Sequence, residues 1–383
     1  MKKRVLSLVL ALVLVLSGCS MQKGLVTQPH TEVPTTEVHP ETTTAPEVST
    51  PKTDYLEIYR PILDGLTELM AKGTDDNGPK EGQNAVWEVM TGMDSLQTAF
   101  STGYAIQDLS GDGIPELLIC DVSRHDGLQA FGSTIYALYT CSGGEPVLCF
   151  EGWARNRYSL LQDNTILNIG SGGAMYAIWG IYNLSPDGTE LQCLDYFFTH
   201  EKDGDFENIA FYHNLTGEWN PDLSEELEMT DEQFWRLQQD AEDRITEISL
   251  IPFCEYGYEH FGSFVQAQWL DEVTEKPESY TEFTINEDES QAKLLFTSFG
   301  TVRDFRLLSL TFVDMDDSGK MNYAIEEIYA LEKLTEDRPL VVGISFFGTI
   351  PNNGIRFTND KGETKTYALH ISGENGSVLL TEI

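Results

Sequence analysis

An acidic stretch, DLSGDGIPELLICD at residues 108–121, carries oxygen-bearing side chains at alternate positions. Counted from Asp108 as position 1, Ser110 and Asp112 stand at positions 3 and 5, and Glu116 stands at position 9. Calcium prefers about six to eight hard oxygen ligands, which carboxylates, hydroxyls and backbone carbonyls supply. The spacing predicts a calcium loop whose ligands are Asp108, Ser110, Asp112, the carbonyl of Ile114 and Glu116.

Glycine at position 6 of the stretch, Gly113, permits the sharp turn that would bring these oxygens together. An EF-hand would need a carboxylate at position 12 and a following helix, but position 12 is Ile119 and Pro115 leads into a strand-like run. The loop instead resembles the calcium loops of integrin-type β-propeller blades and related VCBS-like repeats, D-x-D-x-D-G-x-x-D entering a strand. It departs from them at Ser110, where an acid or amide is usual, and at Glu116, where Asp is usual. The resemblance implies one structural ion, and it does not extend to a whole propeller.

A turn without an ion is the alternative interpretation of this stretch, with Asp108 and Asp112 capping backbone amides. Three acids within nine positions repel one another unless a cation neutralises them, which favours calcium. A weaker repeat of the pattern, DMDDSGKMN, begins at Asp314 and includes Gly319. It is more typical of an acidic hairpin turn, and a second ion there stays open.

The first eighteen residues have the pattern of an export signal, with Lys2, Lys3 and Arg4 before an apolar run. As a helix this run would reach roughly 20 Å, short of the ~30 Å hydrocarbon core of a bilayer. The sequence LSGC that ends at Cys19 resembles the lipobox of bacterial lipoproteins, which implies cleavage before Cys19 and a diacylglycerol on its sulfur. Two acyl chains make a stable anchor. We therefore expect a protein tethered to the extracellular face of the cell membrane; a plain secretory signal is the alternative.

The net charge of the chain is −38, from 62 acidic and 24 basic residues. Cleavage after residue 18 would remove three basic residues and no acid, which takes the mature charge to −41. A nucleic-acid partner would require a basic surface, so that class of function is excluded. A strongly acidic domain also concentrates divalent cations around it and stays soluble.

Composition and periodicity divide the chain into four segments: a signal peptide at 1–18, a disordered Thr/Pro-rich tether at 19–53, a helix and β-meander domain at 54–270, and a β-sandwich-like domain at 271–383. Apolar spacing predicts a helix in 55–72, which Pro61 is expected to end or kink in its first turn. Thr230 and Gln233 form a capping box for a later helix. The predicted fold class is α+β, with an antiparallel hairpin meander after the first helices.

The cysteines other than Cys19 are five in number and lack any C-x-x-C pair, so the sequence does not predict a zinc site. Cys141 and Cys149 flank a predicted hairpin, and whether they form a disulfide stays open. The histidines of the folded part match no metalloprotease motif, and no catalytic residue is predicted.

Three functions compete on these observations. The lipobox, the Thr/Pro tether, GYA-x-x-D before the acidic loop and a terminal GSVLLTEI together resemble lipoproteins of gut clostridia, a group that has no assigned activity to carry over. The leading prediction is a lipid-anchored binding or scaffolding module whose ligand, protein or glycan, is unknown. The alternative is an exported hydrolase acting on glycan or peptide, which would need a base and a nucleophile or two carboxylates in a cleft. A transporter receptor would need two α/β lobes, and the alternating strand–helix units for these are missing.

Overall fold

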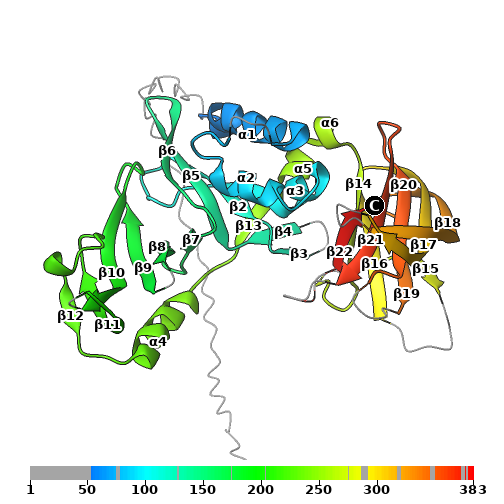
Figure 1. Ribbon diagram of the computed structural model, residues 1–383. Coiled ribbons are helices and arrows are strands. Elements are labelled where there is room, and N and C mark those ends of the chain that lie inside the picture. The colour runs from blue at the N-terminus through cyan, green and yellow to red at the C-terminus, as the bar shows by residue number, and fades with distance from the viewer. Residues whose placement is uncertain are drawn as a thin grey trace, which may run out of the picture. The chain divides into compact units, whose positions relative to one another are not determined.

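Antiparallel strands make up most of the protein, and helices make up a smaller share (Figure 1). The prediction of a strand-rich chain is confirmed. The computed structural model describes residues 53–74, 78–126, 129–173, 175–202, 204–274, 276–285, 292–316, 321–345, 350–371, 376 and 378–383. The predicted signal peptide, Cys19 and nearly all of the predicted tether lie outside these ranges. Residues 53–383 belong to one compact unit.

The helices are α1 (Tyr55–Lys72), α2 (Asn84–Met90), α3 (Ser95–Ser101), α4 (Asp231–Glu242), α5 (Phe253–Tyr256) and α6 (Tyr258–Phe261), with a 3-10 turn η1 (Pro221–Leu223).

The first helix packs its apolar side chains against the sheet. Asp54 caps α1 by accepting a hydrogen bond from the amide of Leu56. The helix continues past Pro61, so of the two expected effects, an end or a kink, the end does not occur. Burial of Tyr59, Leu63, Leu66 and Met70 outweighs the one backbone hydrogen bond that proline removes.

The capping box predicted for the later helix is present. Thr230 accepts from the amide of Gln233, and the Gln233 side chain accepts from the amide of Thr230, at the start of α4. Among the helices of the described residues, none is both long and apolar enough to cross a membrane.

The larger sheet has thirteen strands, with the order β12-β11-β10-β9-β8-β7-β5-β2-β1-β13-β4-β3 and β6 paired to β5. Each strand from β7 to β11 pairs with the next in sequence, whereas β1 pairs with both β2 and the distant β13. The strands are β1 (Thr102–Gln107), β2 (Glu116–Asp121), β3 (Arg124–Asp126), β4 (Gln129–Gly132), β5 (Thr134–Ser142), β6 (Glu145–Glu151), β7 (Asn156–Leu160), β8 (Ile166–Gly173), β9 (Tyr176–Leu184), β10 (Leu191–Lys202), β11 (Asp205–Asn214), β12 (Glu225–Leu227) and β13 (Ile248–Pro252).

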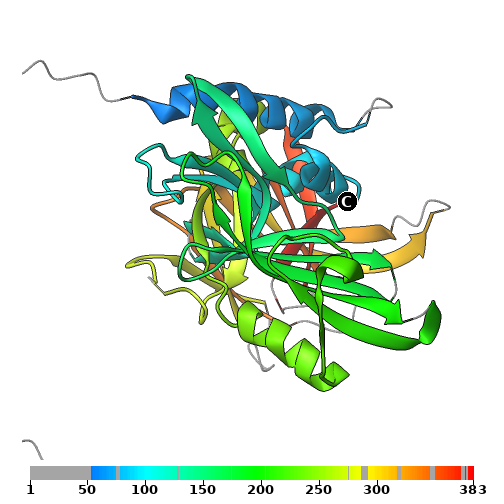
Figure 2. The same cartoon turned by 90° about the vertical axis from the view of Figure 1, so that its left-hand side faces the viewer.

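Strand β2 is buried on both of its faces. Leu117 and Ile119 belong to the core that α1, α2, α3 and α5 share with the sheet, and α1 runs along that side (Figures 1 and 2). Leu118 and Cys120 point to the opposite face and join a second core with β5, β7, β8 and β13. Alternation of side chains along a strand makes the two sets face opposite ways. The acidic loop therefore leads into one of the most firmly packed strands of the protein.

Two further sheets follow in the C-terminal part. The four-stranded sheet has the order β14-β16-β19-β15, and the five-stranded sheet has the order β18-β17-β20-β21-β22. Both contribute to one hydrophobic cluster, which includes Phe296 from the first and Phe305 and Phe357 from the second. The strands are β14 (Phe264–Trp269), β15 (Thr281–Thr284), β16 (Ala292–Phe299), β17 (Val302–Met315), β18 (Met321–Leu334), β19 (Leu340–Ile344), β20 (Asn353–Thr358), β21 (Thr364–Ile371) and β22 (Val378–Glu382).

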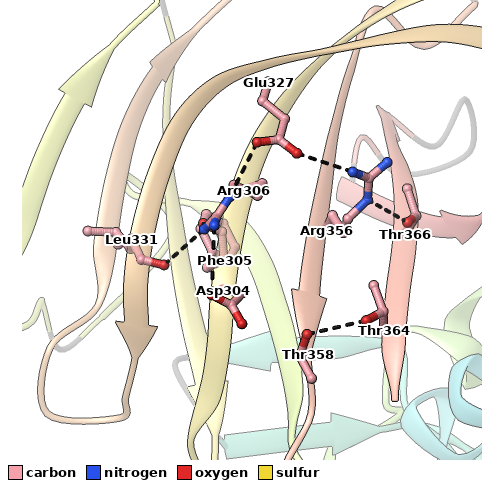
Figure 3. Close-up of polar contacts among 9 residues, drawn as sticks. All are labelled: Asp304, Phe305, Arg306, Glu327, Leu331, Arg356, Thr358, Thr364 and Thr366. Carbon is pink, nitrogen blue, oxygen red and sulfur yellow. Dashed lines mark hydrogen bonds and ion pairs between the residues drawn. The ribbon is translucent and has the colours of Figure 1, made fainter. Parts of the chain in front are cut away.

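A ladder of polar side chains crosses β17, β18, β20 and β21 (Figure 3). Arg306 and Arg356 are direct cross-strand neighbours, and Glu327 lies between them, with its two oxygens 3.3 Å from Arg306 Nε and 3.2 Å from Arg356 Nη1. Arg356 Nε also donates to the hydroxyl of Thr366. Because these groups are partly exposed, each pair contributes only about 0–1 kcal/mol. Glu327 mainly removes the repulsion between the two guanidinium groups.

Candidate functional site

The acidic loop connects β1 to β2, whose ends pair Gln107 with Glu116. Gly111 and Gly113 have φ angles of 79° and 88°, in the left-handed region that glycine adopts without strain. At the end of the loop, the hydroxyl of Tyr59 on α1 donates to the carbonyl of Pro115 at 2.8 Å. The loop is thus held by two strands and a helix.

The two aspartates of the loop accept hydrogen bonds from its backbone. Asp108 Oδ1 accepts from the amide of Gly111 at 2.7 Å, and its Oδ2 accepts from the amide of Gly113 at 3.0 Å. Asp112 Oδ1 accepts from the amide of Ile114 at 2.7 Å. These are the backbone caps that the turn interpretation predicts. Each oxygen keeps a further lone pair, because one hydrogen bond does not exhaust a carboxylate oxygen.

Glu116 is the buried member of the predicted set, with 0% of its surface exposed. Its Oε2 accepts from the amides of Leu109 at 2.7 Å and Ser110 at 3.3 Å, so the side chain holds the start of the loop. Burial raises the pKa of Glu116, and the hydrogen-bonding groups of Leu109 and Ser110 offset part of that effect. This burial could not be predicted from the sequence, since Glu116 follows Pro115 at the edge of a polar turn.

Two buried oxygens in this region, Glu116 Oε1 and Thr140 Oγ1, have no hydrogen-bond partner, and the buried hydroxyl of Ser110 interacts with the same carboxyl group. A β-carbon at Gly188 would lie 2.6 Å from Glu116 Oε1 and 2.8 Å from Thr140 Oγ1, so the backbone of Gly188 closes over this side of the carboxylate. Unpartnered buried oxygens destabilise a fold unless something neutralises them. The carboxylate and the two hydroxyls suit a hard cation or a proton.

The predicted ligands supply the oxygen atoms that calcium prefers. Their acidic side chains, however, do not gather around one point. Within the described ranges, no group of three or more His, Cys, Asp or Glu side chains lies close enough together to hold a metal ion. An ion at this loop would depend on the hydroxyl of Ser110 and on backbone carbonyls such as that of Ile114, in addition to the carboxylates. In the weaker repeat, the side-chain amide of Asn322 donates a hydrogen bond to Asp314 Oδ1 at 2.8 Å. Gly319 lies outside the described residues.

A pocket of about 550 Å³ lies elsewhere, among α3, β3, β14, β20, β21 and β22. Its walls include the rings of Phe100, His125, Phe264, Trp269 and Tyr367. The Phe100 and His125 rings stack with centroids 4.1 Å apart, and Phe264 meets Phe100 edge-on at 6.0 Å. This volume and this aromatic lining are typical of sites for small organic molecules.

His125 is the titratable group fixed within the pocket wall. The side-chain nitrogen of Gln266 lies 2.7 Å from its Nδ1, a hydrogen-bonding distance. Burial lowers the pKa of His125 to about 4, and a backbone contact with Phe100 offsets only part of that effect. The ring is therefore uncharged at neutral pH. Sequence reasoning missed this pocket, because its walls come from segments more than 100 residues apart.

A histidine and an aspartate do meet at one place in the larger sheet. His213 Nε2 lies 3.0 Å from Asp195 Oδ1, the spacing of a general base and its orienting acid. The nearby thiol of Cys193 is a poor nucleophile, because burial and the charge of Asp195 raise its pKa to about 11.

Cys141 and Cys149 both have free thiols, so the open question of their pairing is answered.

Comparison of the chain with protein-family models, with curated proteins and with solved structures finds no match.

Proposed function

We propose that this protein is a lipid-anchored binding protein of the outer face of a bacterial cell membrane, with a structural calcium ion at the loop 108–116. The aromatic pocket is the observation on which the binding function depends, because it combines a volume of about 550 Å³ with a few fixed polar groups such as Gln266 and His125. We further propose the α+β layout, with the C-terminal sheets as a β-sandwich, since both bury side chains in one cluster.

The anchor rests on the sequence LSGC, whose cysteine would carry the lipid. A chain of 34 or so Thr/Pro-rich residues before the first helix would let the folded unit stand away from the bilayer. The net charge of −38 supports this placement, because anionic headgroups would repel the folded unit.

Replacing Cys19 by Ala should move the protein from the membrane fraction to the medium or to a soluble fraction, because the acyl chains supply the anchor. Fractionation of cells with an antibody to the folded part measures this. Cys193→Ala, a cysteine change in the folded part, is the matched control and should stay with the membrane. Retention of the Cys19→Ala protein would contradict the lipid anchor.

The calcium site is supported by the spacing of Asp108, Ser110, Asp112 and Glu116 in the sequence and by the buried, unpartnered oxygen Glu116 Oε1. A cation there would relieve the buried charge of Glu116 and the repulsion among the three acids of the loop. It would also fix the entry to β2, which is buried on both faces.

Calcium should raise the free energy of unfolding by roughly 2.7 kcal/mol at a hundred times its dissociation constant. Thermal melting of the chain from residue 53 onward, with calcium and with a chelator, measures the gain. Asp112→Ala should abolish it. Asp163→Ala removes another turn carboxylate that caps a backbone amide, that of Thr165, and should leave the gain intact. Melting curves of the unaltered chain that coincide with and without calcium would rule out the ion.

A further inference from the structure

The pocket is lined by flat apolar surfaces on several sides. Phe100 and His125 form one stacked pair, and Phe264 stands against Phe100. Trp269 lines the same pocket, with its indole nitrogen donating to the carbonyl of Gly376 at 2.9 Å, which fixes the orientation of the ring. Rings of this kind bind flat apolar bodies and, through their faces, attract cations.

The positive charge at the pocket is already neutralised. Arg124 is the basic residue of the lining, and its Nε and Nη2 lie 3.1 Å and 2.8 Å from the two oxygens of Glu247. Asp126 approaches the same guanidinium at 3.9 Å, and the ring of Phe131 lies under it. A bidentate pair of this geometry leaves little of the arginine for an anionic ligand.

A negative charge at the pocket is left over. Glu272 also lines it, and among the ion pairs of the described residues no cation neutralises this glutamate. With His125 uncharged at neutral pH, the one arginine and two glutamates among the described lining residues give them one net negative charge. The field of a chain with net charge −38 adds to it, drawing cations toward the pocket and repelling anions.

We propose that the pocket binds an organic cation with a flat apolar body, such as an ammonium group on an aromatic ring system. The apolar body lies against Phe100, Phe264 and Trp269, and the ammonium group faces Glu272. This proposal rests on the binding function proposed above and adds the class of ligand to it.

The test uses three ligands with the same indole body and different charge: tryptamine, a cation; tryptophol, which is neutral; and indole-3-acetate, an anion. Each compound is titrated calorimetrically into the mature protein, which begins at the lipidated Cys19 and is held in bilayer nanodiscs. The heat measured with empty nanodiscs is subtracted. Tryptamine should bind about ten-fold more tightly than indole-3-acetate, with tryptophol between them. Glu272→Gln should remove most of this preference, and Glu332→Gln, the same charge change at an exposed site on β18, should retain it.

The outcomes separate the two proposals. Equal affinities for the three compounds, or tighter binding of the anion, would overturn the cation preference and leave the binding function standing. A preference that survives in the Glu272→Gln protein would overturn the role given to that acid. If none of the three binds at millimolar concentration, the pocket is not a binding site, and both proposals fall.

Discussion

Replacing Glu116 by alanine should lower the free energy of unfolding by about 2–4 kcal/mol. The substitution removes the acceptor of the amides of Leu109 and Ser110 and leaves a cavity beneath the loop. Both losses act at the start of β2, where the surrounding strands cannot easily close the gap. Denaturation of the chain from residue 53 onward in urea measures the change.

Replacing Glu116 by Gln keeps the shape of the side chain and removes its charge, so the two contributions to stability can be measured separately. Its carbonyl can still accept from the two amides, while its amide group replaces the unpartnered oxygen Oε1 beside Thr140. Because burial raises the pKa of Glu116, the wild-type protein loses stability as pH rises from the ordinary carboxyl pKa of 4.5 through the raised value. With a chelator present, Glu116→Gln should therefore match the wild type near pH 4 and exceed it at pH 7.

Calcium should reverse that order. With the ion bound, the wild type gains stability that Glu116→Gln cannot, so the two melting curves at pH 7 should exchange places when calcium replaces chelator. If Glu116→Gln follows the wild type at every pH and in both buffers, the buried carboxylate carries neither an unfavourable charge nor an ion.

Gly132→Ala should cost about 3 kcal/mol, the upper end of what overpacking a well-packed core costs. A β-carbon at this position would lie 1.8 Å from the carbonyl oxygen of Asp121 and 2.8 Å from Leu250. The strand end must move to relieve the overlap, and this breaks the hydrogen bonds that the Asp121 carboxylate accepts from the amides of Ser133 and Thr134. The free energy of unfolding from urea titration measures the loss.

Gly65→Ala is the matched control for this change. Gly65 lies inside α1, and a β-carbon there would meet nothing within 4 Å. Alanine should therefore stabilise the protein by about 0.5–1 kcal/mol through the backbone entropy of the unfolded chain. A destabilisation of similar size at both glycines would contradict the steric argument.

Local features of the structure could be predicted from the sequence because neighbouring residues determine them. The capping box of Thr230 and Gln233 needs only a single turn of helix, and the alternating runs of the C-terminal part need only a buried face. The sharp bend at Gly113 follows from the local residues for the same reason, whereas the calcium ion predicted there stays a prediction. That α1 continues past Pro61 could not be predicted from the neighbouring residues, because the helix packs against side chains of other elements.

Long-range pairing set the remainder. Tyr104 pairs with Ile251, almost 150 residues later, and nothing in either segment specifies that partner. The burial of Glu116 depends on Gly188, and the pocket depends on β14, whose residue Gln266 bonds to His125. Side chains that meet only after such pairing cannot be assigned to a site from periodicity alone.

Every cysteine of the described residues has a free thiol, and burial raises the pKa values of Cys120 and Cys254 most strongly. Such thiols are almost never in the reactive thiolate form while the fold is closed. The fold can therefore form without oxidoreductase enzymes, and reducing surroundings would leave it intact. These two thiols become accessible only when the protein opens locally or globally. Their alkylation rate therefore reports how often the fold opens.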